Sequence, residues 1–193
     1  MRHRPFQTVL CAAALVPLLV CCGTAAKEPA PEPEAPPAFH FANGDLVISE
    51  FASDAVKGNL FDPCTEITEE EYAQAGIEGV DTFENEFGDD QVVKSCTSIE
   101  PSADSNRRIE ASVLSENSLK ASGAKQIDHP QSSVPGLYTV REGAGSCRAQ
   151  VDTERGAFAI GLWKNDHEGK EDTVCSEAQQ EMEKLYEAVS GDE

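Results

Sequence analysis

The chain has 193 residues, with 35 acidic residues against 15 basic ones and a formal net charge of −20. This charge argues against nucleic acids and anionic lipid head groups as partners, because both are negatively charged and repel it. The acidic residues do not follow the D-x-D-x-D-G spacing of a calcium-binding loop. We therefore interpret them as a solvated surface, and we predict neither a metal site nor a cofactor.

Residues 1–21 have the layout of a bacterial lipoprotein signal peptide. Two arginines precede an apolar run from Val9 to Val20, which is too short for a membrane-spanning helix of roughly 20 residues. The run ends in Leu19-Val20-Cys21-Cys22, with a branched apolar residue three positions before Cys22 and a small residue just before it. We predict cleavage after Cys21 and a diacylglyceryl group on Cys22, which would hold the protein on the outer face of the cell membrane.

Two other ways of processing remain open. If Cys21 carried the lipid, the bulky Val20 would stand at the cleavage point. Ordinary secretion with cleavage after Ala26 would use Thr24-Ala25-Ala26 as a small-x-small site. Removal of residues 1–21 leaves 13 basic against 35 acidic residues, so the mature net charge is −22.

Residues 22–38 read as a tether between the anchor and a domain. The segment from Lys27 to Ala38 has five prolines and no aliphatic side chain larger than alanine, so it cannot form a core. Its prolines favour an extended polyproline conformation of ~3.1 Å per residue, or roughly 40 Å in all. We expect residues 39–193 to fold as a single domain.

The domain shows a short helix pattern, then five strand patterns, then a final helix pattern. Thr68 and Glu71 form a capping box, which predicts a short helix that ends at Gly76. Residues 153–156 predict a hairpin turn, with Gly156 supplying a positive φ. Strands are predicted at 91–97, 108–114, 136–141, 146–152 and 157–163.

The C-terminal part of the chain shows the clearest periodicity. In 146–152 the apolar residues alternate with Arg148, Gln150 and Asp152, and in 157–163 the larger apolar residues alternate in the same way. A final helix begins near Asp172-Thr173. Its apolar stripe is Val174, Ala178, Met182, Leu185 and Val189. Together these patterns predict an α+β fold, an antiparallel β-sheet packed by helices.

Besides the lipid-bearing Cys22, four cysteines remain after processing: Cys64, Cys96, Cys147 and Cys175. In an exported domain an even number of cysteines predicts disulfides, here two, and four cysteines allow three pairings. Packing the final helix on the sheet would bring Cys147 and Cys175 together and leave Cys64 with Cys96, although crossed pairings remain possible. Zinc is disfavoured, because there is no C-x-x-C pair and no histidine near a cysteine.

Each of the four cysteines also lies in a short sequence motif. Phe61-Asp62-Pro63-Cys64, Ser95-Cys96, Ser146-Cys147-Arg148 and Val174-Cys175, in this order, resemble an actinobacterial cell-envelope lipoprotein family of unknown function. The resemblance covers residues 58–189. It implies an α/β/α sandwich like that of the photosystem PsbP-type proteins, with disulfides Cys64–Cys96 and Cys147–Cys175. It supplies no catalytic residues.

No catalytic apparatus stands out in the sequence. Ser146 does not lie in a G-x-S-x-G elbow, and Ser122-Gly-Ala-Lys125 has the S-x-x-K spacing without its partner motifs. Trp163 is the only tryptophan, and the alternation places it on one face of the sheet and Phe158 on the other. It either packs under a second helix layer or is an exposed contact residue.

From these observations we expect a non-catalytic binding or accessory module of the cell envelope. Its partners would be the membrane, through the lipid, and an envelope protein or a lipid-like ligand. A carrier of an apolar ligand between the final helix and the sheet is one alternative. A hydrolase with a dispersed site is another.

Overall fold

The computed structural model describes residues 35–81, 92–99, 105–123, 126–143, 145–164 and 171–190. They belong to one compact unit, Ala35–Glu193. The predicted signal peptide, the lipid acceptor Cys22 and the tether up to residue 34 lie outside the described residues.

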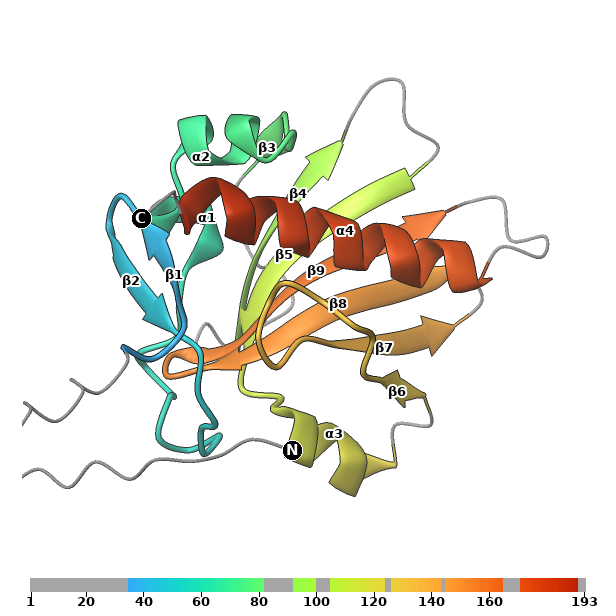
Figure 1. Ribbon diagram of the computed structural model, residues 1–193. Helices are drawn as coiled ribbons and strands as arrows, with labels where there is room; N and C mark the ends of the chain where they lie inside the picture. Colours follow the sequence, from blue (N-terminus) through green and yellow to red (C-terminus); the bar gives the residue numbers. More distant parts are fainter. Residues whose placement is uncertain are drawn as a thin grey trace, which may run out of the picture. The chain divides into compact units, whose positions relative to one another are not determined.

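The centre of the domain is a seven-stranded sheet in the order β3-β4-β5-β9-β8-β7-β6, in which every neighbouring pair is antiparallel (Figure 1). The five predicted strands are confirmed, with ends displaced by at most three residues, whereas the two-residue edge strands β3 and β6 were not predicted. The strands are β3 (Val80–Asp81), β4 (Val93–Ile99), β5 (Ser105–Ser112), β6 (Ile127–Asp128), β7 (Tyr138–Gly143), β8 (Ser146–Thr153) and β9 (Gly156–Lys164).

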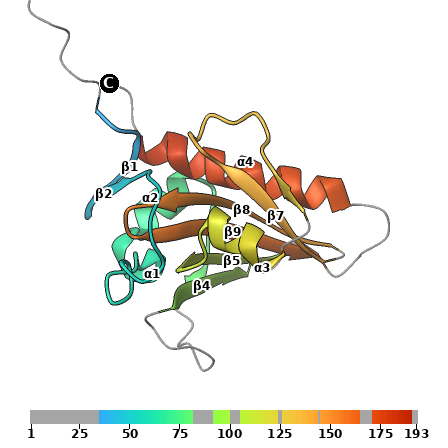
Figure 2. The same cartoon turned by 90° about the horizontal axis from the view of Figure 1, so that it is seen from below.

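Helix α4 (Glu171–Val189) lies across one face of the sheet and packs on β8 and β9 (Figures 1 and 2). The predicted apolar stripe is confirmed, since its five residues are all buried; Met182 and Leu185 are 0% exposed. The stripe faces the inward row of the sheet, where Cys147, Ala149 and Val151 pair with Leu162, Ile160 and Phe158. The main core therefore lies between α4 and the central strands.

An N-terminal hairpin closes one end of this core. Strands β1 (Ala38–Phe41) and β2 (Gly44–Val47) were not predicted, because they directly follow the proline-rich segment and are only four residues long. The Phe39 ring meets the rings of Phe158 and Tyr186 edge to face, at centroid distances of 5.4 and 5.0 Å. Such contacts between aromatic rings fix the hairpin against both the sheet and α4.

Two short helices follow the hairpin on the same side as α4. Helix α1 (Pro63–Glu66) has Asp62 as its N-cap, and α2 (Glu69–Gln74) has the predicted capping box between Thr68 and Glu71. Burial alone would raise the pKa of Glu71, but hydrogen bonds from Thr68 and from the Ala42 N–H outweigh it and hold that pKa below its ordinary value. The Ala42 contact is 2.6 Å long, so the capping carboxylate also ties α2 to the first hairpin.

The predicted turn at 153–156 is confirmed, and it joins β8 to β9. Gly156 has φ +105°, and a Cβ there would lie 2.6 Å from Leu60 Cδ2 and 2.9 Å from the Ser112 carbonyl oxygen. Arg155 in the same turn donates to both oxygens of Glu66, at 2.5 and 2.8 Å. The turn therefore fastens α1 to the sheet.

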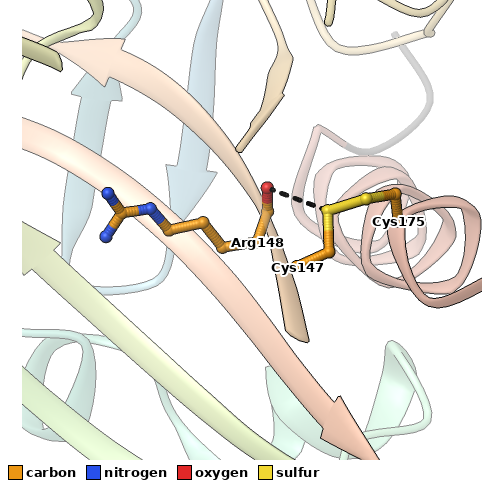
Figure 3. Close-up of a disulfide and its surroundings, with 3 residues drawn as sticks. All are labelled: Cys147, Arg148 and Cys175. Atoms are coloured by element: carbon orange, nitrogen blue, oxygen red, sulfur yellow. Dashed lines mark hydrogen bonds between the residues drawn. A yellow bond between two sulfur atoms is a disulfide. The ribbon is translucent and has the colours of Figure 1, made fainter. Parts of the chain in front are cut away.

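Of the two predicted disulfides, the structure forms Cys147–Cys175, which joins β8 to α4 (Figure 3). Cys64 and Cys96 are not bonded to each other here, although they are neighbours. The pKa of the Cys64 thiol lies above its ordinary value, first because of its contact with Cys96 and second because of burial. A Cys64–Cys96 bond stays a prediction.

The other face of the sheet carries one described helix, α3 (Glu116–Ser122). Its Leu119 packs on Tyr138, Val140 and Ile127, near the β6–β7 edge. The described residues thus show an α+β domain with a deep core on one face and a local helix contact on the other.

Candidate functional site

Trp163 lies in the row of β9 that points away from α4, as the alternation predicted. It pairs with Asn106 on one neighbouring strand and with Ser146 on the other. Figure 3 shows the same alternation on β8, where Cys147 points to α4 and the Arg148 side chain extends to the opposite side. The Trp163 side chain is half-buried.

A depression of about 220 Å³ opens beside this tryptophan. We call it the Trp163 hollow. Its side chains come from four adjacent strands: Arg108 and Glu110 of β5, Glu142 of β7, Ser146 and Arg148 of β8, and Trp163 of β9. None of its lining residues belongs to α3, so the described helices do not cover it.

Gly161 also lines the hollow, between the two arginines. A Cβ at this position would lie 3.6 Å from Arg148 Cβ and 3.8 Å from the Arg108 carbonyl oxygen, which are ordinary contact distances. The backbone would therefore accept a side chain here. The absence of one contributes to the space beside Trp163.

The charged groups of the hollow form a connected set of ion pairs. Arg148 Nη1 lies 2.9 Å from Glu110 Oε1 and 3.3 Å from Glu142 Oε1. Arg108 Nη1 lies 3.9 Å from Glu110 Oε2. The Arg148 and Glu110 side chains are 10% and 11% exposed, whereas Glu142 and Arg108 are 45% and 55% exposed. An inner buried pair is thus flanked by an outer carboxylate and an outer guanidinium.

Arg108 also contacts the tryptophan. Its guanidinium carbon lies 5.9 Å from the Trp163 ring centroid, near the ~6 Å limit of a cation–π interaction. At this distance the contact is weak. The hollow therefore combines an aromatic ring, two donor-only guanidinium groups and two acceptor-only carboxylates.

A second polar cluster on the same face is structural. The Tyr138 hydroxyl donates to Asp152 at 2.7 Å, Gln150 donates to Tyr138 at 2.6 Å, and Asp152 accepts from the Glu116 N–H at the start of α3. Burial is the main reason that the pKa values of Tyr138 and Asp152 lie above their ordinary values. Tyr138 and Gln150 are at most 1% exposed, so the cluster holds α3 rather than facing solvent.

A second depression, of about 410 Å³, lies between α2 and β3. Its polar side chains include Glu69 and Glu78, and its walls are formed by Tyr72, Ala73, Ile77 and Val80. The residues that would line an apolar cavity under α4, Met182 and Leu185, border neither depression. They are packed into the core instead.

The structure brings one residue singled out by the sequence, Trp163, together with four charged residues, three of which sequence reasoning missed. Arg148 was recognised as facing away from the apolar row, but the partners Arg108, Glu110 and Glu142 lie on other strands. Only the register of the sheet, in which Arg108 and Arg148 both pair with Gly161, makes them neighbours. No local sequence signal would have revealed that.

The described residues show neither a membrane-spanning helix nor a cluster of metal ligands. Within the described ranges no helix is both long and apolar enough to cross a membrane. Across the same residues no three histidine, cysteine or acidic side chains gather as a metal site would require. No protein-family model matches the chain, and neither the curated proteins nor the solved structures give a match.

Proposed function

We propose that this chain is an exported lipoprotein that works outside the cell membrane as a non-catalytic binding or accessory module. It would be anchored through a lipid on Cys22 and would contact its partner through the Trp163 hollow. The observation that carries the proposal is the hollow itself. Half-buried Trp163 and exposed Arg108 lie in a part of the sheet face that α3 does not contact. Tryptophan and arginine are residue types that are enriched in protein interfaces.

The two alternatives have less support. A carrier needs an apolar cavity, but Met182 and Leu185 are fully buried against the sheet. A hydrolase needs a nucleophile with a base in a cleft. Ser146 lines the hollow, but the glutamates beside it are paired with Arg108 and Arg148. These ion pairs give little support to a glutamate acting as the base for a serine nucleophile.

The anchor is tested by mass spectrometry of the N-terminus of the protein purified from cells. We expect a diacylglyceryl group on Cys22, and we expect Cys22→Ala to block processing. Cys21→Ala is the matched control, because alanine is also small and should leave processing intact. An unmodified N-terminus at Lys27, or loss of the lipid in Cys21→Ala alone, would contradict the assignment.

The contact surface is tested by photo-crosslinking in intact cells. A photoreactive amino acid at Glu142, on the rim of the hollow, should give a discrete crosslinked product. The same amino acid at Glu187, an exposed position on α4, is the control and should give none. Equal products from both positions, or none from Glu142, would contradict the proposed surface. Native mass spectrometry that finds a stoichiometric lipid and no other partner would instead support the carrier.

We also propose Cys64–Cys96 as a second disulfide, within a PsbP-like sandwich in which α4 and α3 pack on opposite faces. The proximity of the two cysteines and the oxidising compartment of an exported protein support the bond. Non-reducing peptide mapping should link Cys64 with Cys96. Two alkylatable thiols, or a crossed link to Cys175, would contradict it.

A further inference from the structure

The chemistry of the Trp163 hollow restricts what can occupy it. Its two arginines and two glutamates cancel in charge, although the whole chain has a net charge of −20. A strongly anionic ligand would face Glu110 and Glu142, and a cationic ligand would face Arg108 and Arg148. The balance therefore favours a neutral ligand that offers donors and acceptors side by side.

The surroundings of the hollow disfavour a lipid-like ligand and a large apolar protein interface. Among the described residues the large apolar side chains that remain exposed are Val92 and Leu114, and neither lines the hollow. A stable protein interface usually buries about 800 Å² per partner around an apolar core. A depression of about 220 Å³ with one aromatic ring is suited to a small polar group instead.

We propose that the Trp163 hollow binds a sugar unit of a neutral glycan. Adjacent hydroxyl groups on a sugar ring both donate and accept hydrogen bonds, so they can meet a guanidinium and a carboxylate at once. The C–H face of the same ring is apolar and packs on an aromatic face. This inference rests on the proposed function, whose binding surface it shares, and it names the class of ligand.

The geometry assigns a part to each group. The Arg148–Glu110 pair, at 2.9 Å and about 90% buried, is held in place before the ligand arrives, which lowers the entropic cost of binding. Exposed Glu142 and Arg108 supply an acceptor and a donor at the rim. Gly161 leaves room for the ring beside Trp163.

The experiment uses the fact that Trp163 is the only tryptophan of the chain, so its fluorescence reports on this site alone. The full chain is purified in a detergent without a sugar head group. It is titrated with maltotriose, mannotriose, arabinotriose and diacetylchitobiose, and separately with glucuronate and decanoate. We expect saturable changes with at least one neutral oligosaccharide at a Kd of about 1 mM or below. We also expect less than about a twofold change in affinity between low and high salt, because a neutral ligand is not screened.

Four variants separate binding at the hollow from other effects. Gly161→Val should fill part of the space and weaken binding about tenfold or more, and its retained fold is checked by circular dichroism. Glu142→Gln should weaken binding by about threefold to tenfold through the loss of a charged acceptor. Glu187→Gln, the same substitution on α4, should change the affinity by less than about twofold. Trp163→Ala, measured by calorimetry, should abolish detectable binding.

The outcomes distinguish this inference from the proposed function. No saturable response to any neutral oligosaccharide, or tighter binding of glucuronate or decanoate, overturns the glycan. If the Glu142 crosslink then yields one specific protein, this result supports the proposed binding module and overturns the glycan as its ligand. If neither the titration nor the crosslink gives a product, both are overturned. Binding that Gly161→Val and Glu142→Gln leave unchanged places the glycan elsewhere and also overturns the inference.

Discussion

The buried Arg148–Glu110 pair gives a sharp test of how the sheet face opposite α4 is held together. Replacing Arg148 with methionine keeps most of the aliphatic stem and removes the charge. Glu110, whose side chain is 11% exposed, would then keep Arg108 as a neighbouring cation, but only at 3.9 Å and with the Arg108 side chain 55% exposed.

The size of the effect follows from the geometry. Two unit charges about 4 Å apart attract by about 4 kcal/mol at an effective dielectric constant of ~20. Loss of one partner of a buried pair costs about 3–5 kcal/mol, because the other charge stays buried without compensation. The Arg148–Glu142 contact adds little, since Glu142 is 45% exposed and solvent screens it. We therefore expect Arg148→Met to lower the free energy of unfolding by about 3–4 kcal/mol.

The double variant Arg148→Met/Glu110→Gln should recover most of this loss, because it removes both charges. We expect it to lie within about 1.5 kcal/mol of the unmodified protein. Urea unfolding at pH 7 followed by circular dichroism measures all three proteins and Glu110→Gln, which completes the double-mutant cycle. A single variant that costs less than about 1 kcal/mol, or a double variant no more stable than Arg148→Met, would refute the reasoning.

Three other predictions follow from the described contacts. Replacing both cysteines of the Cys147–Cys175 disulfide, which are 28 residues apart, with alanine should cost about 3.6 kcal/mol in urea unfolding by the chain-entropy estimate; an unchanged midpoint would contradict it. Gly156→Ala should lower the free energy of unfolding by about 2–4 kcal/mol through backbone strain and the clash with Leu60. Gly44→Ala should lower it clearly less, because a Cβ there meets nothing within 4 Å, and equal losses would contradict the clash. Burial alone would raise the pKa of Glu66, but Arg155 and the Asp62 N–H hold it below the ordinary 4.5. This carboxylate therefore stabilises the fold above about pH 4.5, and the stabilisation is lost as the pH falls through the lowered pKa. Glu66→Gln should reduce the loss of unfolding free energy at acidic pH, and an unchanged pH dependence would contradict the prediction.

Periodicity and turn chemistry were sufficient for the local structure of the domain. The alternation in β8 and β9, the Gly156 turn and the stripe of α4 each depend on residues close in sequence, and all were predicted correctly. The same logic paired Cys147 with Cys175, because an apolar strand face and an apolar helix face must meet to be buried. The alternation also placed Trp163 on the face opposite Phe158.

The short strands β1, β2, β3 and β6 carried too little pattern to be recognised. Each depends on its partner rather than on its own sequence; β1, for example, is fixed by the rings that Phe39 meets in Phe158 and Tyr186. Contacts of this kind join residues more than 100 positions apart, and no local propensity encodes them.

The sequence by itself determined the α+β class and the direction in which Trp163 points, whereas the export signal that it predicts lies outside the described residues. Only the tertiary structure decided what stands beside that tryptophan. Arg108, Glu110 and Arg148 come from β5 and β8, whose register with β9 accompanies the burial of Ile109, Ile160 and Ala149 in the core on the opposite face. Glu142 comes from the end of β7, where the register with β8 shifts. Because a strand alternates its side chains, fixing the apolar row also fixed the polar row behind it. The hollow therefore follows from how the core packs.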